Sequence, residues 1–237
     1  RENTEGLFYA RGRGDARRDA QGRTVEVFDT MRITRHGTDR ICAFAFELAQ
    51  RRAERLGRAG RVTNVDKANV FESMAFFREV FEDVASRHPA IGADSAYVDA
   101  MALNLVLKPW SYDVLVTENM FGDILSDLIA ALVGGMGMAP SADLGERHGL
   151  FQPAHGTAPD IAGQGKANPT AMILSAAMML DWLAERHGDA RLGDAARGIE
   201  QAVEAVFAGG SVLPFEFGGG DGTRAITEAV LEQLRHA

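Results

Sequence analysis

Two aspartates spaced four residues apart, Asp123 and Asp127, are the side chains in this sequence best suited to hold a metal ion. Residues four apart lie on one face of a helix about one turn from each other, so two carboxylates there repel unless a cation lies between them. Mg²⁺ is commonly held by one or two carboxylates together with substrate oxygens and water. The alternative is a pair of solvated aspartates on an exposed face, which is the more frequent arrangement for an isolated pair.

The surroundings of the two aspartates favour the metal site. An apolar run at 113–117 predicts a buried strand ending at Glu118, and Asn119 is suited to cap the helix that follows. Ile124 and Leu125 make that helix apolar on one side. Because sites in α/β proteins are built just beyond the carboxyl ends of strands, we predict a divalent cation here.

Two further polar residues, Lys67 and Asp99, also follow strand-like runs. A lysine in such a position usually points to solvent, but one held beside carboxylates and a metal can act as a base with a tuned pKa. Asp99 is suited to supply a third carboxylate.

The segment 155–169 is a Gly- and Pro-rich loop ahead of a predicted helix. Such loops let the backbone approach a ligand closely, and a helix N-terminus favours anions. The segment lacks the G-x-G-x-x-G fingerprint of Rossmann dinucleotide sites. From the residues alone, a nucleotide-binding loop and an ordinary surface loop are equally good interpretations.

The composition of the 237 residues, 46% hydrophobic and 24% charged, is that of a globular protein. The net charge of −8 argues against nucleic-acid binding. The single cysteine, Cys42, excludes an internal disulfide and fits a reducing compartment. No secretory signal pattern is present and no apolar run reaches the ~18 residues of a membrane span, so we expect a cytoplasmic protein with no membrane partner.

The order of the expected elements indicates an α/β fold with two domains, at 1–133 and 134–237. Glycines among charges at 7–33, with an alternating strand pattern from 24 to 33 that suggests a half-buried strand, predict a protruding arm. The second half is loop-rich between 135 and 168. The expected helices lie near 38–57, 71–87, 119–133, 194–208 and 227–236, with a short helix ending at 107 and a long apolar one opening at 169. The remaining strands are expected near 62–65, 96–99 and 113–117.

Five motifs resemble the β-decarboxylating dehydrogenases, the family of 3-isopropylmalate, isocitrate, homoisocitrate and tartrate/D-malate dehydrogenases. They are R-E-N-T-E-G (1–6), V-D-K-A-N-V (65–70), Y-V-D-A (97–100), E-N-M-F-G-D-I-L-S-D (118–127) and H-G-T-A-P-D-I-A-G…A-N-P (155–169). The resemblance implies the isocitrate/isopropylmalate dehydrogenase-like fold, which is not a Rossmann fold. It implies a substrate, metal and dimerisation domain at 1–133 and the C-terminal part of the cofactor domain at 134–237.

The resemblance also implies roles for single residues. Arg1 matches an arginine that binds a substrate carboxylate, and Asp123 and Asp127 match ligands of Mg²⁺ or Mn²⁺ that are joined by Asp99 of the partner subunit. Lys67, also from the partner, handles the proton of the C2 hydroxyl, so a homodimer is expected. The implied NAD-binding residues are Asn69 near the nicotinamide and His155, Gly156, Thr157, Ala158, Asp160 and Asn168 around the adenosine. The carboxylate of Asp160 favours NAD over NADP, because it accepts hydrogen bonds from the ribose hydroxyls and repels a 2′-phosphate.

The activity implied is metal-dependent oxidative decarboxylation of a small 2-hydroxy acid of the malate type by NAD⁺, with 3-isopropylmalate favoured. The alternatives are tartrate or D-malate, isocitrate or homoisocitrate as substrate, a non-catalytic regulatory relative, or a plain metal-binding structural module. Family members carry a further segment ahead of R-E-N-T-E-G that this sequence lacks, so we expect the N-terminal part to be missing and these 237 residues alone to be inactive.

The second departure concerns the proton donor. The family has a tyrosine where this chain has Phe8, and the neighbouring phenol is Tyr9. A phenol can protonate the enol and a phenyl ring cannot, so Tyr9 is the catalytic candidate and Phe8 a substrate-binding one. If the segment is extended, Tyr9 is the weaker candidate, because adjacent side chains then point to opposite faces.

Overall fold

The structure, a computed structural model, describes residues 1–236 and divides into two compact units, Arg1–Ser126 and Asp127–Ala237. The boundary lies within helix α4 (Asn119–Leu132), which carries both Asp123 and Asp127. Each unit is described below by itself.

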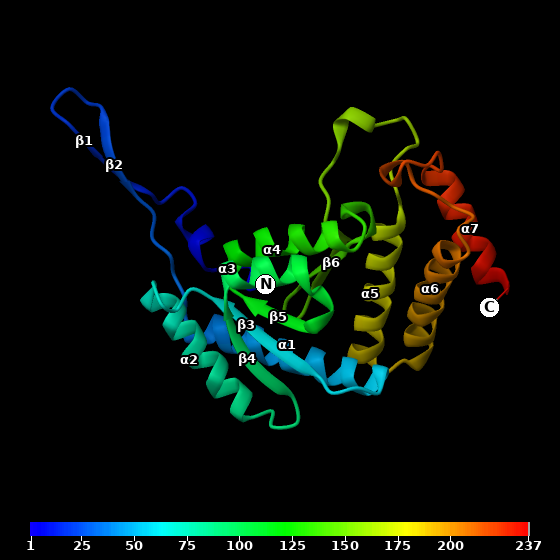
Figure 1. The fold of residues 1–237 in the computed structure, drawn as a ribbon, viewed down its shortest axis with the longest axis horizontal. Helices are drawn as coiled ribbons and strands as arrows, with labels where there is room; N and C mark the ends of the chain where they lie inside the picture. Colours follow the sequence, from blue (N-terminus) through cyan, green and yellow to red (C-terminus); the bar gives the residue numbers. More distant parts are fainter. Residues whose placement is uncertain (237) are drawn as a thin grey trace. The chain divides into compact units, whose positions relative to one another are not determined.

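The first unit is built on a three-stranded parallel sheet with the order β4 (Gly92–Tyr97), β3 (Arg61–Asp66), β5 (Val114–Thr117). The central strand β3 is buried from Val62 to Asp66, as expected for a strand with neighbours on both sides. In the register of the sheet, Asp66 lies beside Tyr97 and Val65 lies beside Thr117. All three strands therefore end at one edge, and the segments that follow them begin at that edge (Figure 1).

Helices α1 (Arg35–Leu56) and α2 (Glu72–Ser86) pack on this sheet and form its core. The shared cluster of buried side chains includes Cys42 and Phe46 of α1, Phe77 and Phe81 of α2, and Val62 of β3. Cys42 is fully buried, and burial raises the pKa of its thiol to about 12. The thiol therefore stays protonated and packs as a small apolar group.

The starts of two helices differ from the sequence predictions. Helix α1 begins at Arg35 with Thr34 as its cap, whose hydroxyl accepts from the Gly37 amide, whereas the sequence suggested a start at 38 or 39. At α4 the capping oxygen belongs to Glu118, which accepts from the Phe121 amide at 2.7 Å. Asn119, the expected cap, is the first helical residue, and its side chain is free to bind elsewhere.

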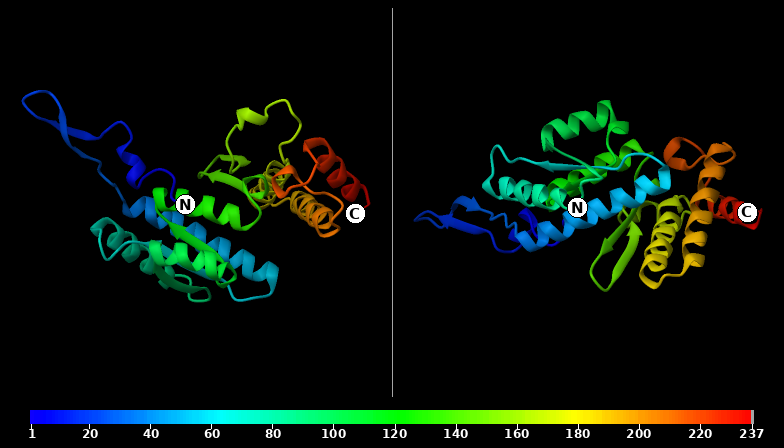
Figure 2. Two further views of the ribbon diagram at one scale, coloured as in Figure 1. Left: turned by 45° about the horizontal axis from the view of Figure 1, so that its top comes forward. Right: turned by 90° about the horizontal axis from the view of Figure 1, so that it is seen from below.

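An antiparallel hairpin of β1 (Asp15–Arg18) and β2 (Thr24–Phe28) extends from the first unit and is seen in every view (Figures 1 and 2, blue). Every residue of both strands is exposed. The alternating pattern of 24–28 therefore does not mark a half-buried strand within this chain, and that prediction is wrong. The 3-10 helix η1 (Leu7–Ala10) precedes the hairpin. Helix α3 (Val98–Leu107) and the turn η2 (Pro109–Ser111) lie between β4 and β5.

The second unit contains a hairpin that the sequence did not predict, formed by β6 (Pro140–Leu144) and β7 (Gly149–Pro153). It packs on α5 (Thr170–His187), where the rings of Phe151 and Trp182 lie 5.8 Å apart. Helices α6 (Ala190–Ala208) and α7 (Thr223–His236) share a second buried cluster that includes Val203, Val206, Ile226 and Val230. Short 3-10 turns lie at η3 (Met136–Met138), η4 (Pro159–Ile161) and η5 (Phe215–Phe217). Among residues 1–236 no helix is both long and apolar enough to cross a membrane.

Candidate active site

The carboxyl edge of the parallel sheet brings together Lys67 and Asp99, which are separated by 32 positions in the sequence. Lys67 directly follows β3, and Asp99 lies in the first turn of α3, just after β4. The Lys67 ammonium donates to the Asp99 carboxylate at 2.7 Å. This bond, together with backbone donors at the start of α3, lowers the pKa of Asp99. The sequence placed each residue after a strand, and the parallel pairing of β3 with β4 is what makes them neighbours.

Arg1 lies across the first turn of α4. Its Nε and Nη2 atoms donate to the Asn119 side-chain oxygen at 2.9 and 2.8 Å, and its Nη1 atom donates to Asp123 at 2.5 Å. A side chain on Gly122 would collide with the arginine, so this glycine allows the close approach. Asn119 is the site residue that sequence reasoning missed, because capping was the stronger local signal.

Asp127 follows Asp123 one turn further along α4 and is exposed. In the part of the chain that the structure describes, no group of three or more His, Cys, Asp or Glu side chains is placed to hold a metal ion. One copy of the chain therefore brings together Asp123 and Asp127 without Asp99, whose carboxylate is paired with Lys67.

The chemistry of α4 nevertheless suits a divalent cation. Its two candidate ligands are carboxylates, which are hard oxygen donors of the kind that Mg²⁺ and Mn²⁺ prefer. The half-buried carboxylate of Asp123 already binds one cationic group, the Arg1 guanidinium. The two residues thus fit a metal that receives its remaining ligands from substrate, water or another chain.

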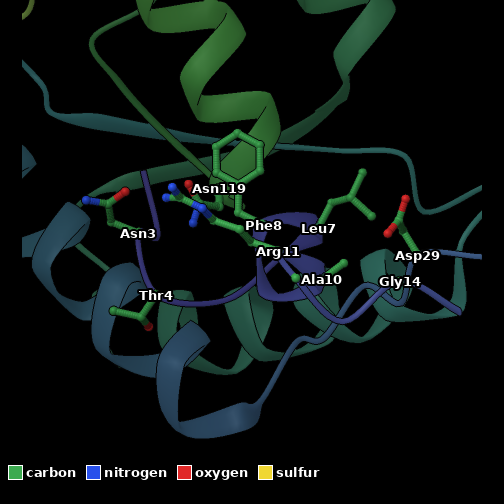
Figure 3. Close-up of a pocket in the computed structure, with 10 residues that line it drawn as sticks. Asn3, Thr4, Leu7, Phe8, Ala10, Arg11, Gly14, Asp29 and Asn119 are labelled. Atoms are coloured by element: carbon green, nitrogen blue, oxygen red, sulfur yellow. The ribbon is translucent and has the colours of Figure 1, made fainter.

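A pocket of about 650 Å³ lies beside the start of α4 (Figure 3). It is bordered by Asn119, by Asn3 and Thr4 before η1, and by Phe8 of η1. The Arg1 guanidinium carbon lies 5.6 Å from the centre of the Phe8 ring, so the ring contacts the same arginine that binds Asn119 and Asp123. The remaining residues around the pocket are Leu7, Ala10, Arg11, Gly12, Gly14 and Asp29.

Tyr9 does not border this pocket. Its ring lies between two guanidinium groups, with Arg13 at 4.3 Å and Arg32 at 4.9 Å from the ring centre. Residues 7–10 form a 3-10 helix, so the segment is not extended. The separation that an extended segment predicts between Phe8 and Tyr9 is still present, because successive side chains of a 3-10 helix point about a third of a turn apart.

The expected nicotinamide residue, Asn69, is exposed in the turn that follows β3, two residues after Lys67. This turn is closed by hydrogen bonds from the amides of Val70 and Phe71 to the Lys67 carbonyl oxygen, at 3.0 and 3.1 Å. Asn69 therefore shares the edge of the sheet with Lys67.

In the second unit, the loop containing His155, Gly156, Thr157, Ala158 and Asp160 projects beyond α5 (Figure 1, yellow-green). Residues 156–160 are exposed, and Ala158 is the only described residue other than glycine with a positive φ, at 40°. Such strain in an exposed loop is often kept for binding. The loop ends at Asn168, which is buried, with Oδ1 accepting from the Thr170 amide and Nδ2 donating to Glu216 at 2.9 Å.

A parallel α/β unit with an acidic helix at the carboxyl edge of its sheet, followed by a Gly- and Pro-rich loop, defines the class of protein. The chain matches the isocitrate/isopropylmalate dehydrogenase family over residues 1–232 and belongs to it. The resemblance and the fold expected from the sequence are thereby confirmed.

Relatives and solved structures agree. The chain is 44% identical to the 3-isopropylmalate/3-methylmalate dehydrogenase of Methanocaldococcus jannaschii, over 99% of this chain and 66% of the relative. It is 42% identical to a 3-isopropylmalate dehydrogenase of Bacillus cereus, over 99% of this chain and 61% of the relative. The crystal structure of isocitrate dehydrogenase from Methylococcus capsulatus superposes with a TM-score of 0.85 and 39% identity, covering 98% of this chain and 65% of that one. The chain thus spans a little under two thirds of the length of these proteins.

Proposed function

We propose that this chain carries the catalytic lysine, the metal-binding aspartates and the NAD-binding loop of a decarboxylating dehydrogenase. The substrate is a malate-type 2-hydroxy acid, with 3-isopropylmalate favoured. The observation that carries the proposal is the Lys67–Asp99 pair at 2.7 Å on the edge of a sheet from which the acidic helix α4 also starts. A relative at 42% identity is named 3-isopropylmalate dehydrogenase and one at 44% is named 3-isopropylmalate/3-methylmalate dehydrogenase, which supports the choice of substrate.

The residues divide the work as follows. Arg1, with donors that now bind Asn119 and Asp123, binds a substrate carboxylate by a charge-assisted contact. Asp123 and Asp127 hold Mg²⁺ or Mn²⁺, with Asp99 of a second copy as the third carboxylate. The bound metal supplies Lewis-acid polarisation of the hydroxyl and carboxylate of the substrate. Lys67, in its neutral amine form, takes the proton of the C2 hydroxyl as the hydride leaves. The bordering ring of Phe8 adds apolar surface near Arg1.

The loop at 155–168 and Asn69 are proposed to bind NAD. The exposed backbone of residues 156–160 can approach a ligand closely, and in this proposal the exposed Asp160 carboxylate accepts hydrogen bonds from the ribose hydroxyls. The buried Asn168 anchors the end of this loop through its hydrogen bonds to Thr170 and Glu216.

A second candidate, a non-catalytic relative retained for binding, is favoured by one observation. The proton-donating tyrosine of the family is replaced by Phe8, and the neighbouring Tyr9 is held between two arginines. The presence of Lys67, Asp99, Asp123 and Asp127 together favours the enzyme, since a binding module has no use for a base beside a set of metal ligands.

The experiment is an assay of nicotinamide reduction by the full-length protein. The panel comprises 3-isopropylmalate, isocitrate, homoisocitrate, tartrate and D-malate, each with NAD⁺ or NADP⁺ and with Mn²⁺ or EDTA. We expect Mn²⁺-dependent turnover, fastest with 3-isopropylmalate, and a higher kcat/KM with NAD⁺ than with NADP⁺. Binding of a malate without turnover would instead favour the non-catalytic relative, and a preference for NADP⁺ would contradict the role of Asp160.

A further inference from the structure

A buried carboxylate, that of Asp66, directly precedes the candidate base Lys67 in the sequence. Its side chain is completely buried and accepts from four donors. Arg78 on α2 donates twice, from Nε at 2.8 Å and from Nη2 at 2.7 Å, and each bond reaches a different oxygen of the carboxylate. The Asn64 side-chain amide donates at 2.5 Å, and the Ala68 backbone amide donates at 2.9 Å. The orientation of the carboxylate is therefore fixed by donors from α2, from its own strand β3 and from the turn that follows β3.

The bond between Asp66 and the Ala68 amide spans Lys67. It closes a turn of the kind that Asp side chains form with the backbone two residues ahead. The amides of Val70 and Phe71 then bind the Lys67 carbonyl oxygen. The backbone of Lys67 is held from both directions, so its side chain starts from a fixed point.

The ring of Tyr97, at the end of β4, lies near both Lys67 and Arg78. The Arg78 guanidinium carbon lies 5.3 Å from the ring centre, and the Lys67 ammonium nitrogen lies 5.6 Å from it. A cation near an aromatic face is attracted to it within about 6 Å. The ring thus contacts the lysine that reaches Asp99 and the arginine that holds Asp66.

We propose that Asp66, Arg78 and Tyr97 are positioning residues that hold the Lys67 ammonium at Asp99. The proposal rests on the proposed function, in which Lys67 is the base. A buried ion pair is a poor source of stability, because burying two charges costs about as much as their attraction returns. The pair instead fixes an orientation. A planar guanidinium that donates to both oxygens of the Asp66 carboxylate restricts the turn at Lys67 to one conformation.

The first test compares Tyr97→Leu with Tyr97→Phe in the full-length protein. Tyr97 is partly exposed, so neither variant leaves a large internal cavity. Tyr97→Leu removes the ring and should lower kcat roughly 10- to 100-fold with little change in KM, since small displacements of a catalytic group have effects of this size. Tyr97→Phe keeps the ring and should retain kcat. Equal losses in the two variants, or none in Tyr97→Leu, would overturn the role of the ring.

The second test separates positioning from stability. Arg78→Lys keeps the charge but loses the pair of hydrogen bonds to the two carboxylate oxygens. It should lower kcat well beyond what a control variant with a comparable change in Tm shows. The matched control is Arg52→Lys, since Arg52 donates to the similarly buried Asp113 at 2.8 Å elsewhere in the same unit. The control should alter Tm by a comparable amount and leave kcat unchanged. If both variants lower kcat alike, the effect is one of general stability and the proposal is wrong.

A third measurement does not depend on activity. In crystal structures of Tyr97→Leu and Arg78→Lys, the Lys67 ammonium should move away from Asp99 or take several positions. An ammonium still at hydrogen-bond distance in both variants would refute the proposal. If instead the wild-type protein oxidises no hydroxy acid while the lysine moves as described, the proposed function fails and the positioning stands.

Discussion

The most consequential side chain at the residue scale is Asp123, because it meets two different cations. In the structure it binds the Arg1 guanidinium, and in the proposed reaction it binds a metal. Arg1 keeps two further bonds to Asn119, so it can remain on α4 when Asp123 turns to another partner. The first turn of α4 is in this sense ready for both the metal and the substrate carboxylate.

Asp123→Asn should weaken Mn²⁺ binding at least ~10-fold, since an amide cannot supply the charge of a carboxylate ligand. The fold should be retained, because the ion pair that is lost is partly exposed and contributes about 1 kcal/mol or less. Calorimetric titration with Mn²⁺ and a thermal melt measure the two effects. Asp181→Asn, at an exposed carboxylate on α5, is the control and should change neither. An unaltered titration in Asp123→Asn would refute the metal assignment.

The second prediction at the residue scale concerns Phe8 and Tyr9 and which of the two positions serves proton transfer. Tyr9→Phe keeps a ring between Arg13 and Arg32 and should change turnover little, since the phenol does not border the pocket. Phe8→Tyr introduces a phenol at the pocket and should raise kcat if protonation limits the rate. The measurement is kcat with its solvent isotope effect on the best substrate.

The opposite outcome for this pair has a definite meaning. A large loss in Tyr9→Phe, with no response in Phe8→Tyr, would show that Tyr9 reaches the substrate after a rearrangement of η1. A change in KM between substrates for Phe8→Tyr, without an isotope effect, would instead assign Phe8 to recognition of the substrate side chain.

At the scale of elements, the second unit depends on the attachment of the candidate NAD-binding loop to α7. The Thr223 amide donates to the Gly165 carbonyl oxygen at 2.8 Å, and the Thr223 hydroxyl donates to the Ala167 carbonyl oxygen. A Cβ at Gly222 would overlap the Gly165 carbonyl oxygen, so the two chain segments touch backbone to backbone. This contact holds the second half of the loop while residues 156–160 stay exposed.

Gly222→Ala should therefore destabilise the second unit by about 1–3 kcal/mol, the usual effect of inserting a group where there is no room. By loosening the loop it should also raise the KM for NAD⁺. The control is Gly220→Ala in the same segment, where an added Cβ meets nothing within 4 Å. Thermal melts and NAD⁺ saturation curves measure the two effects. The same Tm and the same KM for NAD⁺ in both variants would contradict the role of this contact.

Much of the arrangement of elements follows from local patterns. Gly57 ends α1 in the left-handed conformation with φ of 62°, as a glycine after a periodic run predicts. The neighbourhood of Lys67 and Asp99 also follows, because parallel strands place their carboxyl ends together. Such features need only the residues nearby and a general rule of strand pairing.

The features that were missed depend on contacts between distant residues. Thr34 rather than Thr38 caps α1, and both its amide and its hydroxyl bind the Glu5 carboxylate, 29 positions away. The hairpin β6–β7 lies in a segment rich in Gly and Pro and is paired across a short turn on the surface of α5. The link from Asp66 through Arg78 to Tyr97 joins three elements, and no spacing in the sequence indicates it.

At the scale of the whole molecule, the exposed apolar side chains suggest how two copies associate. In the structure α2 buries Phe77 and Phe81 in the core of its own unit. Helix α3 instead exposes Leu103, Val106 and Leu107 by 60, 59 and 62%, and α4 exposes Ile124 by 59%. Leu103, Val106 and Leu107 lie three to four positions apart on one face of α3, and an exposed apolar patch is typical of an interface.

We therefore predict a homodimer of the full-length protein that buries α3. Leu103→Glu should shift it toward monomer in sedimentation velocity at micromolar concentration, because a charge in an apolar interface is costly. Leu56→Glu, at an exposed leucine at the end of α1, is the control and should leave the dimer intact. A wild-type protein that sediments as a stable monomer would contradict the prediction.

The last prediction follows from how the site is divided between copies. If Lys67 and Asp99 of one copy complete the site formed by Asp123 and Asp127 of the other, two inactive variants can rescue each other. Co-expressed Lys67→Met and Asp123→Asn chains should regain roughly a quarter of wild-type activity, because about half of randomly paired dimers are mixed and each mixed dimer has one intact site. Lys67→Met with Asp99→Asn should regain none, since these two residues act together at 2.7 Å and every mixed site lacks one of them. Absence of rescue in the first pair would show that each copy works with its own lysine, and rescue in the second would show that Lys67 and Asp99 reach a site from different copies.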